Sequence, residues 1–129
     1  MIRIYQGIDI VEVSKLRKIL QKNPAFAAEV FTEKERAYCM SHKNHIVHMA
    51  GRLAAKEACL KALGTGLSGI SGSLLDIEIS NLPSGRPELR LSGWIGRLGR
   101  KKKISEKTVS ISHSGSYAVA SVIMLGDVV

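Results

Sequence analysis

The chain has 129 residues, of which 45% are hydrophobic and 23% are charged, a composition that excludes wholesale disorder. This length fits one domain, residues 1–129, and makes a second independent core improbable. The 19 Lys and Arg residues outnumber the 11 Asp and Glu residues, which gives a net charge of +8. Such an excess favours an anionic partner, but nucleic acid, a phosphorylated small molecule, an acidic protein and a lipid surface all remain open.

The longest apolar stretch is about half the roughly 20 residues that a membrane-spanning helix needs. The first residues contain no apolar segment typical of a secretory signal. We therefore expect a cytoplasmic protein without a membrane partner. The two cysteines, Cys39 and Cys59, are too few for a disulfide scaffold and should be reduced thiols, Cys59 as small core filler.

The first half of the sequence predicts one strand and three helices. Residues 2–13 are rich in β-branched side chains, which is typical of a strand, with Gly7 as a bulge or bend. Ser14 should cap a helix that ends near residue 22. Thr32 and Glu35 have the spacing of a capping box, which opens a helix to about residue 41. Small residues recur on one side of residues 50–63, and this third helix should end at Gly64.

The second half predicts mostly strands. Residues 75–79 and 88–91 alternate between apolar and polar side chains around a turn at 83–87, which indicates an antiparallel hairpin. Residues 94–103 fit either a short helix or a basic loop, and 109–112 and 117–124 fit strands. This order predicts an α+β fold with helices packed on one face of a mostly antiparallel sheet.

Several motifs are weak signals. The glycines of a dinucleotide fingerprint, at 64, 66 and 69, follow a helix instead of opening one. The basic run 99–103 has no aromatic residue for base stacking, so a solvated loop is favoured over nucleic-acid binding. Four possible zinc ligands recur at every third position: Cys39, His42, His45 and His48. This spacing spreads side chains around a helix, so solvated or phosphate-facing histidines are favoured over zinc ligands.

Asp9 and a helix in the middle of the chain carry the most informative pattern. Asp9 lies in an apolar strand, where a buried carboxylate needs a cation or hydrogen-bond donors. Glu57 and Lys61 are neighbours on one side of the helix, while Arg52 and Lys56 project from another edge. Two carboxylates from separate elements can hold Mg²⁺, with Lys61 beside a bound phosphate. The alternative is a Glu57–Lys61 surface pair, with Asp9 capping a turn.

Ser112 and His113 are neighbours on a predicted strand, so their side chains should point apart. This disfavours a nucleophile and its base. A phosphate-binding histidine and hydroxyl, or a histidine satisfied within a turn, remain the two interpretations.

Five segments together resemble the holo-[acyl-carrier-protein] synthase family of small phosphopantetheinyl transferases. They are GIDIVEV at 7–13, FTEKE at 31–35, GRLAAKEACLKALGTG at 51–66, GRP at 85–87 and ISH at 111–113. They follow the family's order and span nearly the whole chain, and the segment 51–66 is highly specific. The resemblance implies a single-domain, 4′-phosphopantetheinyl transferase-like fold. It also implies transfer of 4′-phosphopantetheine from coenzyme A to a serine of apo acyl carrier protein, which releases adenosine 3′,5′-bisphosphate.

The resemblance further implies a Mg²⁺-dependent homotrimer with its sites at subunit interfaces. Asp9 and Glu57 would bind the metal, and Lys61 would contact the transferring phosphate. The base for the carrier serine would be Glu57 or a metal-bound hydroxide. The positions that match the coenzyme A pocket are Arg52, Gly64, Arg86, Pro87, Ser112 and His113.

Within that pocket, Arg52 and His113 would lie at the 3′-phosphate, and the turn at 85–87 near the adenine. The sequence departs from the family pattern at Ser114, where Thr or Asp is frequent, and at 97–103, which is more basic than expected. Both departures concern nucleotide binding and not the reaction.

The polar side of the first helix would dock the acidic carrier protein through four basic residues: Lys15, Arg17, Lys18 and Lys22. An ordinary solvated face is the alternative. A nucleic-acid-binding module would explain the net charge but would leave Asp9, Glu57 and Lys61 without a role. A purely structural oligomerising domain would explain only the apolar strands. Both classes stay open as alternatives, although we expect no nucleic-acid partner.

Overall fold

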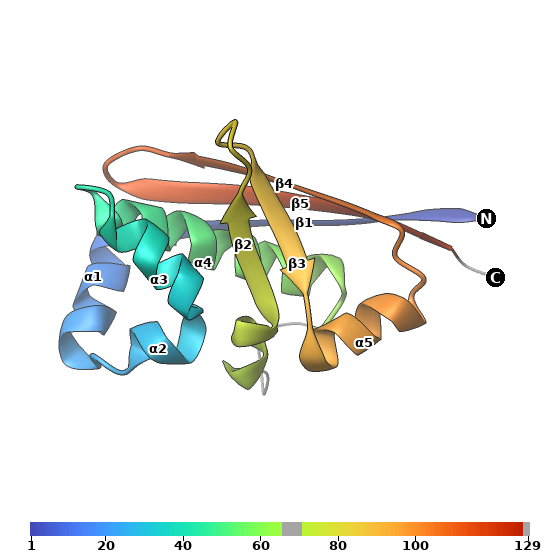
Figure 1. The fold of residues 1–129 in the computed structure, drawn as a ribbon, viewed down its shortest axis with the longest axis horizontal. Coiled ribbons are helices and arrows are strands. Elements are labelled where there is room, and N and C mark those ends of the chain that lie inside the picture. Colours follow the sequence, from blue (N-terminus) through green and yellow to red (C-terminus); the bar gives the residue numbers. More distant parts are fainter. Residues whose placement is uncertain (66–70, 128–129) are drawn as a thin grey trace.

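The computed structural model of the chain describes residues 1–65 and 71–127 (Figure 1). Three antiparallel strands form the main sheet in the order β1-β5-β4, namely Ile2–Glu12, Tyr117–Asp127 and Glu106–His113. A separate antiparallel hairpin pairs β2, Ile77–Asn81, with β3, Pro87–Leu91. The predicted hairpin is confirmed, but it forms its own two-stranded sheet instead of joining the main one.

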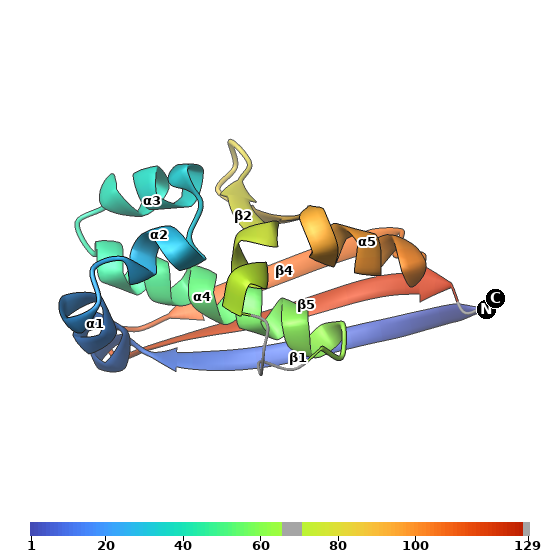
Figure 2. The same ribbon diagram turned by 90° about the horizontal axis from the view of Figure 1, so that it is seen from below.

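The longest helix, α4, lies along one face of the main sheet, and the hairpin and the shorter helices lie on the same side (Figure 2). The predicted α+β fold with helices on one face of an antiparallel sheet is therefore confirmed. No helix within residues 1–65 and 71–127 is long and apolar enough to span a membrane. The helices are α1 (Val13–Lys22), α2 (Phe26–Val30), α3 (Glu33–Met40), α4 (His45–Ala62), the 3₁₀ helix Ser71–Asp76 and α5 (Gly93–Lys101).

A glycine lets α4 approach the sheet closely enough to place the site. The pairing of β1 with β5 runs without interruption through Gly7, which lies opposite Val122, so the predicted bulge is wrong. A Cβ atom on Gly7 would lie only 1.9 Å from the carbonyl oxygen of Ala58 on α4. The missing side chain thus allows contact between the strand and the helix backbone. Asp9 follows two residues later, so it faces the same helix.

Several boundaries differ from the predictions. Helix α1 begins two residues early with Glu12 as N-cap in place of the predicted Ser14, which lies inside the first turn and donates its hydroxyl to the Glu12 carboxylate at 2.8 Å. Helix α4 begins at His45, five residues before the predicted start. The short helix α2 was not predicted, and β2 begins only at Ile77, after the 3₁₀ helix. The basic segment that fitted a helix or a loop is helix α5, and β4 and β5 are longer than predicted.

The capping box of α3 is confirmed and anchors a buried ion pair. The Thr32 hydroxyl accepts from the Glu35 backbone at 3.2 Å, and the Thr32 backbone donates to the Glu35 carboxylate at 2.8 Å. The same carboxylate lies 2.7 Å from the Lys56 ammonium, and both side chains are fully buried. Lys56 also donates to the backbone carbonyls of Leu74 and Ile77 at 2.8 and 2.6 Å. This network joins α3, α4 and the hairpin.

Both cysteines are buried free thiols, as predicted. Burial raises the pKa of Cys39 to about 11 and that of Cys59 to about 12. Neither thiol is therefore a ready nucleophile or metal ligand.

Candidate active site

Two carboxyl groups that are 48 positions apart in the sequence meet between β1 and α4. Asp9 lies on the face of β1 that is turned to α4, and Glu57 lies on that helix. The Glu57 pKa is raised to about 8, first by burial and then by a hydrogen bond and charge repulsion from Asp9, whereas Lys61 lowers it. The hydrogen bond between the two carboxyl groups makes them direct neighbours. The structure therefore brings Asp9 and Glu57 together, as the metal hypothesis requires.

Lys61 pairs with the strand and not with its helix neighbour. Its ammonium lies 2.7 Å from Asp9 Oδ1 and donates to the carbonyl of Ile8 at 3.1 Å. The lysine side chain is 45% exposed, whereas that of Asp9 is 11% exposed. The alternative of a plain Glu57–Lys61 surface pair, with Asp9 capping a turn, therefore does not describe this site. The ammonium is held at the solvent side of the carboxyl pair, where it can meet an incoming anion.

The carboxyl pair fits a divalent cation. Asp9 Oδ2 is buried and accepts no hydrogen bond. Its neighbour Glu57 is another carboxyl group, which can donate only when it holds a proton. Buried carboxylate oxygens without donors are ligands of the kind that Mg²⁺ or Ca²⁺ prefers, and two such groups leave other coordination positions for water and phosphate oxygens. In the described part of the chain, no cluster of three or more His, Cys, Asp or Glu side chains could hold a metal by itself.

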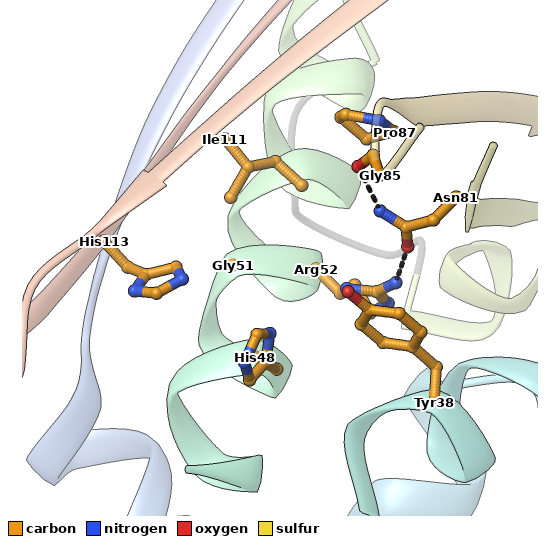
Figure 3. A pocket seen from close by; sticks show the side chains of 9 residues that line it. All are labelled: Tyr38, His48, Gly51, Arg52, Asn81, Gly85, Pro87, Ile111 and His113. Carbon is orange, nitrogen blue, oxygen red and sulfur yellow. Dashed lines mark hydrogen bonds between the residues drawn. The ribbon is translucent and has the colours of Figure 1, made fainter. Parts of the chain in front are cut away.

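A second site is a pocket of about 160 Å³ between α3, α4, the hairpin and β4 (Figure 3). Three residues that the resemblance assigned to coenzyme A line it, namely Arg52, Pro87 and His113. Gly85 also lines it, as part of the turn at 85–87 that was expected near the adenine. Sequence reasoning did not assign the remaining lining residues to this pocket: Tyr38, His48, Gly51, Asn81 and Ile111.

Arg52 is the fixed positive charge of this pocket. Its side chain is 4% exposed, and its guanidinium carbon lies 3.9 Å above the centre of the Tyr38 ring. It donates to the side-chain oxygen of Asn81, whose amide donates in turn to the Gly85 carbonyl at 2.9 Å (Figure 3). Arg52 Nε is buried and has no hydrogen-bond partner. A buried guanidinium with an unused N–H is suited to bind a phosphate group.

The two sites share one property that sets them apart from the rest of the protein. Within residues 1–65 and 71–127, Asp9 Oδ2 and Arg52 Nε are the two buried side-chain atoms without a hydrogen-bond partner. Native proteins satisfy most buried polar atoms, so such exceptions require an explanation. One atom is an acceptor that fits a cation, and the other is a donor that fits an anion.

Some of the missed residues left a signal in the sequence. His48 lies four residues before Arg52, so the two share one side of a helix that extends to residue 45. Gly51 has a packing reason, because a Cβ atom there would lie 2.9 Å from the Ile111 side chain. Asn81 left no signal, since its role depends on how the hairpin packs against α4.

Three predicted pocket residues lie elsewhere in the single chain. Gly64 follows the end of α4 with a φ of 76°, which confirms the predicted helix stop but places it about 18 Å along the helix from Arg52. Ser112 lies on the opposite face of β4 from Ile111 and His113. Arg86 lines a neighbouring hollow of about 320 Å³ between the hairpin and β4.

The remaining predicted features are placed as follows. The four basic residues of α1 (Lys15, Arg17, Lys18 and Lys22) are all exposed. Of the dinucleotide-like glycines, those at 66 and 69 lie outside the described residues. The assumption that the Cys39–His48 set lies on one helix is wrong, because α3 ends at Met40 and α4 begins at His45. The rings of His42 and His48 lie 4.2 Å apart.

Comparisons with known proteins agree with this geometry. A family model described as the 4′-phosphopantetheinyl transferase superfamily matches residues 6–122. The holo-[acyl-carrier-protein] synthase of Caldanaerobacter subterraneus is 43% identical over 123 residues, which cover 95% of each chain. That of Moorella thermoacetica is 43% identical over 114 residues, which cover 88% of each chain.

Solved structures show the same fold. The holo-(acyl-carrier-protein) synthase from Bacillus anthracis, in complex with CoA (3′,5′-ADP), is 36% identical with a TM-score of 0.79, and the match covers 98% of this chain and 100% of that one. The acyl carrier protein synthase of Plasmodium yoelii with ADP bound is 32% identical with a TM-score of 0.86, and the match covers 99% of both chains. The fold, the site and these matches together show that the chain belongs to the 4′-phosphopantetheinyl transferase superfamily.

Proposed function

We propose that this protein is a holo-[acyl-carrier-protein] synthase, which transfers 4′-phosphopantetheine from coenzyme A to a serine of apo acyl carrier protein. The observation that carries this proposal is the pairing of Asp9 and Glu57, a potential cation site, in a chain that also has a buried arginine pocket for an anion. Coenzyme A contains a diphosphate, which suits the first site, and a separate phosphate monoester, which suits the second. The Bacillus anthracis relative has CoA (3′,5′-ADP) bound.

The catalytic groups divide the reaction between them. Asp9 and Glu57 would hold Mg²⁺, which when bound withdraws charge from the diphosphate of coenzyme A. The Lys61 ammonium, 2.7 Å from Asp9, offsets negative charge on the transferring phosphate and on the departing nucleotide. Glu57 is the candidate that accepts the proton of the serine hydroxyl as the serine oxygen attacks phosphorus in line.

The second site would hold the nucleotide. Arg52 and His113 are proposed to bind its 3′-phosphate, and Pro87 and Arg86 to lie near the adenine. Arg52 and Glu57 are five residues apart, so they project about 140° apart around α4 and about 7.5 Å apart along it. The carboxyl pair therefore faces β1, whereas the pocket opens toward β4, at the other edge of the sheet.

We propose that the complete site forms between copies of a homotrimer. The face of the main sheet that α4 does not cover carries Ile4, Ile8 and Ile10, which are 60–67% exposed, and such an apolar face favours burial against another copy. Ser112 also lies on this uncovered face, so it would contact a nucleotide that is bound in the pocket of a neighbouring copy. Gly64, about 18 Å from Arg52, would likewise contribute across the interface. If sedimentation shows a stable monomer with full activity, the proposal of a site between copies is wrong.

The carrier protein is proposed to dock on α1. The exposed side of this helix carries Lys15, Arg17, Lys18 and Lys22, and an acidic partner would be attracted by these charges. Arg17→Glu should therefore raise the KM for the carrier protein several-fold while leaving the KM for coenzyme A unchanged. Equal changes in both constants would count against docking on this helix. A cytoplasmic location is part of the proposal.

The direct test of the function is transfer of label from coenzyme A that is radiolabelled in its pantetheine portion. The purified protein is incubated with apo carrier protein and Mg²⁺, and the carrier protein is then collected and counted. A carrier protein whose acceptor serine is replaced by alanine is the matched control. Label on the serine carrier and not on the alanine carrier supports the proposal, and no label on either contradicts it.

A further inference from the structure

Three histidines from separate parts of the chain lie in contact beside the arginine pocket. His42 follows α3, His48 belongs to α4 and His113 to β4. The ring centres of His42 and His48 are 4.2 Å apart, and those of His48 and His113 are 5.3 Å apart. Tyr38 packs against His42 at 4.5 Å and against His48 at 5.8 Å, and the same tyrosine ring carries the Arg52 guanidinium.

The three rings form a row at one side of the pocket, in the order His42, His48 and His113. His48 and His113 line the pocket together with Arg52, as Figure 3 shows, and His42 stacks behind His48. His42 Nδ1 lies 2.9 Å from the Tyr38 carbonyl, which can only accept a hydrogen bond. Nδ1 therefore donates to this carbonyl, which leaves Nε2 of the neutral ring as an acceptor.

The surroundings of His48 are electropositive. Burial lowers its pKa most, and His42, His113 and Arg52 each lower it further. These charged or titratable groups come from the turn after α3, from β4 and from α4, and Tyr38 faces His48 from α3. Positive charge on the imidazole is therefore disfavoured while no anion is bound. A phosphate dianion in the pocket would reverse this balance, because it attracts the same positive charge.

We propose that His48, with His42 stacked behind it, joins Arg52 and His113 in a binding site for a phosphate monoester, and that this site takes up a proton when the phosphate binds. The inference rests on the proposed function, because the phosphate monoester is the one in coenzyme A. His48 is a binding residue in this scheme, and His42 is a positioning residue that acts through His48.

The sign of the pH dependence follows from these charges. Without an anion, the lowered pKa of His48 favours its neutral form, whereas a bound phosphate favours its imidazolium form, so affinity rises as the pH falls. With one proton taken up per ligand, the dissociation constant falls by up to about tenfold per pH unit. The gain ends near pH 6, where a phosphate monoester itself begins to lose its second charge.

Isothermal titration calorimetry of coenzyme A binding measures this proton directly. Titrations at pH 7 in buffers of different ionisation enthalpy give the number of protons taken up, and titrations from pH 6 to 8 give the affinity. The variants are His48→Phe and His48→Gln, the first retaining the ring and the second a polar group, together with His42→Phe. His45→Phe is the matched control, because His45 lies on the same helix, outside the row.

We expect wild type and His45→Phe to take up close to one proton, and both His48 variants to take up less than half of that. Dephospho-coenzyme A, which lacks the phosphate monoester, should bind without proton uptake to every variant. Normal binding of coenzyme A with equal uptake in wild type and both His48 variants would overturn this inference alone. No binding of coenzyme A to the wild type at any pH would overturn both the inference and the proposed function.

Discussion

Two lysines on α4, five residues apart, form ion pairs of equal length with opposite consequences. Lys56 lies 2.7 Å from Glu35, and Lys61 lies 2.7 Å from Asp9. The first pair is fully buried and saturated with hydrogen bonds, since Lys56 donates to two backbone carbonyls and Glu35 accepts from two backbone N–H groups. The second pair is open to solvent, and Asp9 Oδ2 has no donor.

A structural ion pair differs from a functional one in how much of its hydrogen-bonding capacity is already used. A saturated pair has no capacity left for a ligand, so it serves to hold α3, α4 and β2 together. At the second pair the charges are not balanced within the chain, because the Lys61 ammonium pairs with Asp9, while burial and the neighbouring Asp9 raise the Glu57 pKa to about 8. An added cation would resolve that imbalance.

The strongest way to separate the two pairs is to remove carboxylates from the open one. We expect Asp9→Asn and Glu57→Gln each to lower kcat/KM about 1,000-fold, which corresponds to about 4 kcal/mol of lost transition-state stabilisation. Thermal unfolding should show a Tm at or above that of wild type, because each change removes repulsion between neighbouring carboxyl groups. Near-normal turnover in both variants would show that the metal assignment is wrong.

Changes at the saturated pair, Glu35 and Lys56, should lower the stability of the protein instead. Glu35→Gln or Lys56→Met leaves one buried charge without its partner, which costs about 3–5 kcal/mol. Urea unfolding followed by circular dichroism measures this loss. The double variant Glu35→Leu/Lys56→Met is the control, since removing both charges should cost less than the sum of the single changes. Additive losses would mean that the two charges do not act as a pair.

The labelling rate of the buried thiols shows which of the two ion pairs holds the helices in place. With pKa values raised to about 11 and about 12, Cys39 and Cys59 have at least about 100-fold less thiolate at pH 8 than an ordinary cysteine. We expect Ellman's reagent to label the thiols of the wild-type protein only as fast as local unfolding exposes them. Lys56→Met should accelerate the labelling and Lys61→Met should not. Rapid labelling of wild type in the absence of denaturant would contradict the buried placement of both thiols.

Sequence reasoning succeeded where the cause is local and failed where it is tertiary. The capping box of Thr32 and Glu35 lies within four residues, and the pattern predicted it correctly. Helix α2 has only five residues and ends beside the buried Phe31, so packing stabilises it more than its own sequence does. The start of α4 was placed too late because His45 and His48 made this stretch look like a polar connection, although Val47 in its first turn is buried in the core.

The candidate site shows the same division. Asp9 was recognisable as a carboxylate in an apolar strand, and the family resemblance connected it with Glu57. The sequence placed Lys56 and Lys61 on different sides of one helix, but it did not show which carboxylate pairs with each of them. The difference between them is set by which element packs against each side of α4: α3 brings Glu35 to Lys56, and β1 brings Asp9 to Lys61. Such partners depend on topology, which local patterns do not encode.

Lys61→Met tests the smallest effect, and its two readouts should diverge. Its side chain is 45% exposed, so the ion pair with Asp9 is screened by solvent and its loss should change the free energy of unfolding by less than about 1 kcal/mol. Activity should fall about tenfold, mainly in kcat, because the lost charge acts on the transferring phosphate rather than on ground-state binding. Lys61→Arg should recover part of that rate, since a cation returns with different geometry. A large loss of stability with unchanged kcat would make Lys61 a structural residue like Lys56, and the distinction between the two ion pairs would no longer hold.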